Sequence, residues 1–139
     1  MRLLRDDRGS TAAELTLVAP LMVLLLLFVV LCGRLATTQL RISDVAHQAV
    51  RAATAARTPA QASAAAHHTA RASLDAAGIT CQSLSVAVDS GDFRPGATVT
   101  VTVSCVVGLQ DLTALGVPGS RTVSSTFSSV VDLWRGVRP

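Results

Sequence analysis

The sequence predicts an α+β fold, in which a long N-terminal helix that crosses a membrane precedes an Ala-rich helix and a small antiparallel sheet of about three strands. Three observations predict it. The apolar residues concentrate in one uncharged run, residues 15–32, and helical periodicity follows that run. The second half of the chain then changes to the two-residue period of strands. Hydrophobic residues make up 50% of the chain but aromatic residues only 3%, which suits a membrane segment plus one small domain.

The apolar run has the length of a membrane span. It holds no charged residue, and only Thr16 and Pro20 interrupt its apolar side chains. At 1.5 Å per residue it reaches about 27 Å, close to the thickness of a hydrocarbon core. A buried soluble helix would need partners on every face. No small-residue cleavage site follows Cys32, as a secretory signal would require. We therefore expect one retained span, at about residues 15–33.

We expect one helix from about Thr11 to Arg57, which contains the span and extends beyond it. Residues 34–57 contain no Pro, and their apolar residues recur at three- and four-residue steps. This amphipathic pattern predicts that the helix leaves the membrane near Gly33 and continues as a stalk. The domains expected are thus a leader (residues 1–9), a span with its stalk (10–57) and an α+β domain (58–139).

A second, Ala-rich helix is expected over residues 60–77. Thr58 suits its N-cap, because a hydroxyl can accept a bond from an N–H group that the first turn leaves free. Pro59 suits the first turn, where a missing N–H has no cost. Gly78 can adopt the left-handed conformation that ends many helices.

Two strands of a hairpin follow. Apolar residues alternate with small or polar ones over residues 83–88 and 98–103, and turn residues fill the segment between them. Matching the apolar faces pairs Val88 with Val99, Val86 with Val101, and Leu84 with Val103.

A third strand is expected over residues 122–133. Its Val123, Phe127 and Val131 would lie on one side. The linker before it, residues 108–119, is expected to be a loop with one helical turn.

Three cysteines bear on the cellular compartment. Cys32 ends the span, so Cys81 and Cys105 form the only plausible disulfide pair. In the expected register Cys105 faces Gln82, and a strict ladder would point the two sulfurs to opposite faces. Cys81 precedes the ladder, however, and a free strand end could turn it round; two buried thiols are the alternative. A disulfide would place this region outside the cytoplasm.

The charge pattern favours a cytoplasmic N-terminus and no nucleic-acid partner. The net charge is +3, and all 12 basic residues are Arg, which is typical of a GC-rich genome such as an actinobacterial one. The Arg residues are scattered and not interleaved with aromatic residues, unlike a nucleic-acid footprint. Arg2, Arg5 and Arg8 precede the span, which favours a cytoplasmic N-terminus under the positive-inside rule.

No set of catalytic or metal-binding residues stands out. The sequence has no G-x-S-x-G motif, and His47, His67 and His68 lie on Ala-rich helix without a nucleophile at a useful spacing. The adjacent His67 and His68 point to different sides, so we interpret them as part of a solvated face. We expect no enzyme activity, no cofactor, no metal and no small-molecule substrate.

The most informative segment is RGSTAAEL, residues 8–15, which runs straight into the span. Glu14 places a carboxylate at the edge of the apolar run, which would cost roughly 2.5–3.5 kcal/mol at the bilayer centre and less at the edge. Cleavage after Gly9 would create a new amino group on Ser10, with Glu14 as the fifth residue. That ammonium, on the same or a neighbouring chain, is a natural partner for the carboxylate and would fix the register between neighbouring helices.

These residues resemble the type IV pilin class, and within it the TadE-like pseudopilins of the tight-adherence (Tad/Flp) pilus system. The resemblance rests on RGSTAAEL, Pro20, the Leu-rich run and the Gly33-Arg34 pair that closes it, and it is strongest over residues 8–50. It implies a pilin-like fold and cleavage between Gly9 and Ser10 by a prepilin peptidase. The partners implied are that peptidase, other pilins or pseudopilins, the Tad inner-membrane platform with its ATPase, and membrane lipid.

The resemblance therefore implies a minor pseudopilin or assembly component in the cell membrane, with its C-terminal domain outside the cytoplasm. Two alternatives remain open. One is an unprocessed bitopic membrane protein whose small extracellular β domain binds a surface partner. The other is a secreted adhesin or inhibitor released by cleavage after the span.

Overall fold

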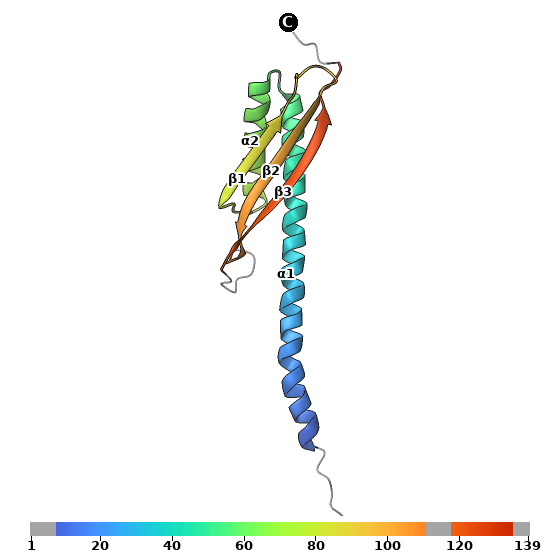
Figure 1. Cartoon of the computed structure of the whole chain (residues 1–139), viewed down its shortest axis with the longest axis vertical. Helices are drawn as coiled ribbons and strands as arrows, with labels where there is room; N and C mark the ends of the chain where they lie inside the picture. Colours follow the sequence, from blue (N-terminus) through green and yellow to red (C-terminus); the bar gives the residue numbers. More distant parts are fainter. Residues whose placement is uncertain (1–7, 111–117, 135–139) are drawn as a thin grey trace, which may run out of the picture. The chain divides into compact units, whose positions relative to one another are not determined.

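The computed structural model of the chain describes residues 8–110 and 118–134 (Figure 1). Two helices come first and three strands follow, so the predicted α+β fold is confirmed. The elements are α1 (Arg8–Ala55), α2 (Pro59–Ala76), β1 (Ser83–Asp89), β2 (Thr98–Gly108) and β3 (Ser120–Val130). α1 begins at Arg8, three residues before the expected Thr11. The third strand, expected over residues 122–133, covers residues 120–130. Most of the predicted 108–119 linker, residues 111–117, and most of the 1–9 leader lie outside the described residues.

Packing divides the chain into two units, Met1–Arg34 and Leu35–Pro139, and α1 contributes to both. The sequence placed the corresponding boundary at Arg57. The difference arises because the amphipathic stripe of α1 between Ile42 and Ala53 is buried in the second unit. That stretch of the helix is part of a domain core and does not stand apart from it.

In the first unit, α1 exposes its apolar side chains. From Leu15 to Val30 the large hydrophobic residues are between 38% and 77% exposed. Pro20 lies inside the helix. Among the described residues, this is the one helix long and apolar enough to cross a membrane, with a mean hydropathy of 3.0 over its best window.

In the second unit, α1 and α2 both contribute alanines to one core. Six of them are fully buried: Ala46, Ala49, Ala53, Ala62, Ala66 and Ala70. The helix ends match the sequence expectation, because the Thr58 hydroxyl accepts a hydrogen bond from the Gln61 N–H and Pro59 opens the helix. Gly78 follows α2 with a φ of +66°, in the left-handed region.

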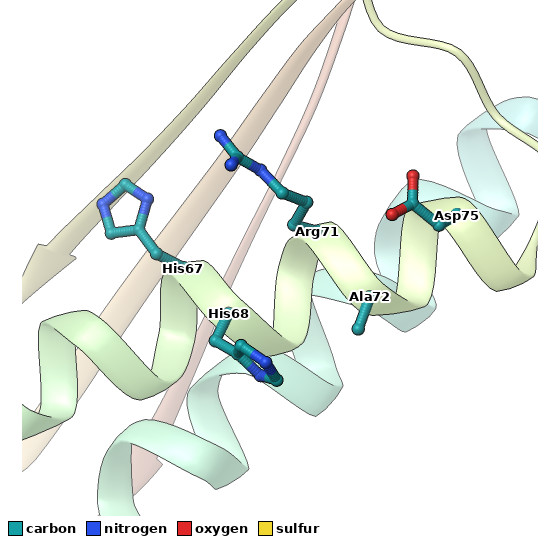
Figure 2. Close-up of a pocket in the computed structure, with 5 residues that line it drawn as sticks. All are labelled: His67, His68, Arg71, Ala72 and Asp75. Carbon is teal, nitrogen blue, oxygen red and sulfur yellow. The ribbon is translucent and has the colours of Figure 1, made fainter.

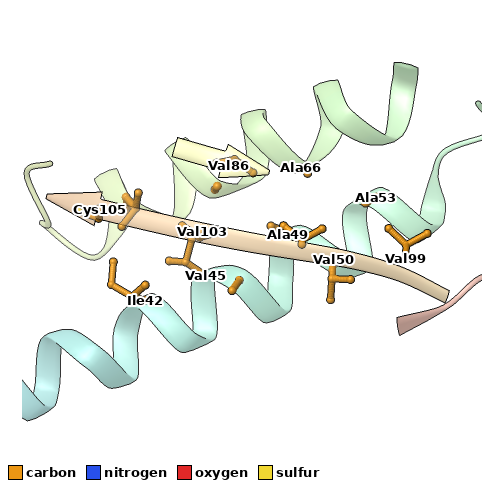
Figure 3. Packing of buried hydrophobic residues seen from close by; sticks show 14 of the residues in the cluster. Ile42, Val45, Ala49, Val50, Ala53, Ala66, Val86, Val99, Val103 and Cys105 are labelled. Carbon is orange, nitrogen blue, oxygen red and sulfur yellow. The ribbon is translucent and has the colours of Figure 1, made fainter. Parts of the chain in front are cut away.

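The sheet is antiparallel, in the order β1-β2-β3, and the helices cover one of its faces. The inward side chains of β2 are almost fully buried, namely Val99, Val101, Val103, Cys105 and Val107. Figure 3 shows Val99 near Ala53 at one end of this core and Cys105 toward Ile42 at the other. On the outer face, hydroxyl pairs link neighbouring strands, as between Thr102 and Thr126 at 2.9 Å.

The predicted hairpin register is wrong by two residues. Val88 pairs with Val101, Val86 with Val103 and Leu84 with Cys105. A shift of two residues keeps every side chain on its face, so the apolar pattern cannot distinguish the two registers. On the other side of β2, the pairing with β3 continues past Thr98 and Val130, where the Val131 N–H donates to the Ala97 carbonyl at 2.8 Å.

Candidate functional site

Residues 9–14, which we call the processing segment, lie at the start of α1. The helix begins at Arg8, so the bond between Gly9 and Ser10 belongs to its first turn. The N–H groups of a first turn have no acceptor within the helix. Glycine also lowers helix stability by about 1 kcal/mol relative to alanine. The Gly9–Ser10 bond, where the sequence analysis expects cleavage, therefore lies in a turn that the helix itself stabilises weakly.

Glu14 lies four residues after Ser10 on the same helix. Residues four apart in an α-helix share a face and are separated by about 6 Å along the axis. Helical side chains also tilt toward the N-terminus of their helix. The Glu14 side chain is exposed, and the apolar stretch that could cross a membrane begins at this residue. The helix thus places a carboxylate one turn beyond Ser10, at the boundary of the span.

The second unit contains the predicted disulfide, between Cys81 and Cys105, whose Cα atoms are 5.4 Å apart. Cys81 precedes β1, and the main chain first meets β2 at the next residue, where the Gln82 N–H donates to the Val106 carbonyl. Cys81 thus lies outside the β1–β2 ladder. Its side chain need not follow the alternation of the strand, so its sulfur can reach that of Cys105. Cys32 is exposed and is not part of a disulfide.

A shallow cavity of about 330 Å³ lies along α2 and is lined by His67, His68, Arg71, Ala72 and Asp75. Figure 2 shows His67, Arg71 and Asp75 projecting to one side of the helix, and His68 and Ala72 to the other. All five residues are exposed. Within residues 8–110 and 118–134, no group of three His, Cys, Asp or Glu could hold a metal ion. The arrangement is that of a solvated helix face.

Several contacts that hold the second unit together were not foreseen from the sequence. Arg41 donates to the Ala77 carbonyl at the end of α2. Two more contacts tie α1 to β3: Gln39 donates to the Ser124 carbonyl at 3.2 Å, and Ser43 and Ser125 join their hydroxyls at 3.1 Å. In the sequence, Gln39, Arg41 and Ser43 stand out only as polar residues beside the apolar stripe of α1, which does not reveal their partners.

A family model described as TadE-like protein matches residues 9–51. The match begins at Gly9 and includes the processing segment, the apolar run and most of the buried stripe of α1, but not α2 or the sheet. Searches of curated proteins and of solved structures find no match. The TadE-like family consists of pilus components and is not an enzyme family. Residues 9–51 therefore match the TadE-like family, which is the family that the sequence resemblance predicted.

Proposed function

We propose that the chain is a minor pseudopilin or assembly component of a Tad-type pilus, matured by a prepilin peptidase between Gly9 and Ser10. The observation that carries the proposal is the order of features in one helix. Gly9 lies in the first turn of α1 and begins the family match, Glu14 follows Ser10 by one turn, and the span begins there.

Cleavage would change the charge at the start of the helix. Water adds across the Gly9–Ser10 bond, which leaves a carboxylate on the leader and an amino group on Ser10. An α-amino group has an ordinary pKa of about 7.7–8.0, so at pH 7 most copies would carry a positive charge. Glu14 then has an ammonium partner, one turn before it on its own helix or on a neighbouring chain, which lowers the cost of holding a carboxylate at the edge of the apolar run.

The topology that fits this scheme has the N-terminus in the cytoplasm and the second unit outside. Arg2, Arg5 and Arg8 precede the span, as expected for a cytoplasmic end. The Cys81–Cys105 disulfide is of the kind that persists in an oxidising compartment. Other pilins or pseudopilins and the Tad inner-membrane platform would then meet α1 in the membrane.

The first test is Gly9→Val, which should leave the chain uncut because a branched side chain would have to fit beside the scissile bond. The measurement is the N-terminal residue of the membrane-extracted chain, by mass spectrometry. Wild type should begin at Ser10. Gly33→Val is the matched control: it lies on the same helix, nothing beyond its neighbouring residues and the helix's own backbone lies within 4 Å of the added Cβ, and cleavage should be normal. A wild-type chain that still begins at Met1 or Arg2, in cells that make Tad pili, would favour the unprocessed bitopic alternative.

The second test is Glu14→Ala, which should leave cleavage largely intact but reduce pilus assembly at least several-fold, because the partner of the carboxylate forms only after cleavage. Assembly is measured as the amount of sheared pili, and Glu14→Gln should behave like Glu14→Ala. Asp44→Ala removes another exposed carboxylate from α1 and should assemble normally. Normal piliation in both Glu14 variants would contradict the assembly role while leaving the cleavage result standing.

A further inference from the structure

We draw no further inference here: the strongest candidate, the edge of β3 from Thr126 to Val130 that faces away from β2, is uncharged and meets no further strand among residues 8–110 and 118–134, but nothing in the structure shows what covers it.

Discussion

The two stretches of α1 on either side of Arg34 belong to one helix but meet different surroundings. Between Leu15 and Val30, large apolar side chains lie on every side of the helix and are exposed. Between Ile42 and Ala53, the apolar side chains form one stripe, and that stripe is buried. A helix that is apolar all round needs an apolar medium from outside the chain, whereas a stripe can be covered by its own domain. The distribution of apolar residues around the helix, more than their number, determines what covers it.

A charge placed in the first stretch is expected to give the largest difference between the two stretches, measured as resistance to extraction from membranes. Leu25→Arg should cost about 3 kcal/mol at the centre of the span and lower the fraction of chain that resists alkaline extraction from membranes. Leu40→Arg places the same charge at an exposed position of the second stretch, where a surface change costs about 0.5 kcal/mol or less, and should stay anchored. Equal extraction of the two variants would mean that the first stretch is not a span.

A smaller effect is expected from a larger side chain in the second stretch. Ala49 is fully buried in the unit that joins α1 to α2 and the sheet, so Ala49→Leu should overpack this core and lower the free energy of unfolding by about 1–3 kcal/mol. The measurement is hydrogen exchange of the β2 amides in the full chain. Ala19→Leu makes the same change at an exposed position of the first stretch and should leave exchange of those amides unchanged. Slower or unchanged exchange in Ala49→Leu would show that the helices do not pack there.

Much of the fold could be predicted because each element carries a local signal. The 3.6-residue stripe of α1, the Thr58-Pro59 start of α2 and the alternation in β2 each reflect the geometry of a single element. The order of Gly9, Ser10 and Glu14 ahead of the span is also legible in the sequence, because these residues are contiguous, and their role in processing stays a prediction. The start of α1 at Arg8 was not predictable, since helix ends depend on a few residues with weak propensities.

Long-range contacts were not predictable. The polar bonds from Gln39 and Ser43 to β3 join residues more than 80 positions apart.

The sequence by itself determined that the chain has a membrane-length apolar helix with a TadE-like start, an Ala-rich second helix, and strands with one apolar face. Only the tertiary structure decided the register of the hairpin and the boundary between the two units. The reason is the same in both cases. A shift of two residues preserves the faces of a strand, and an amphipathic stripe is the same in a free stalk as in a domain core. The choice depends on which distant residues fill the space beside them, here the valines of β2 and the alanines of α2.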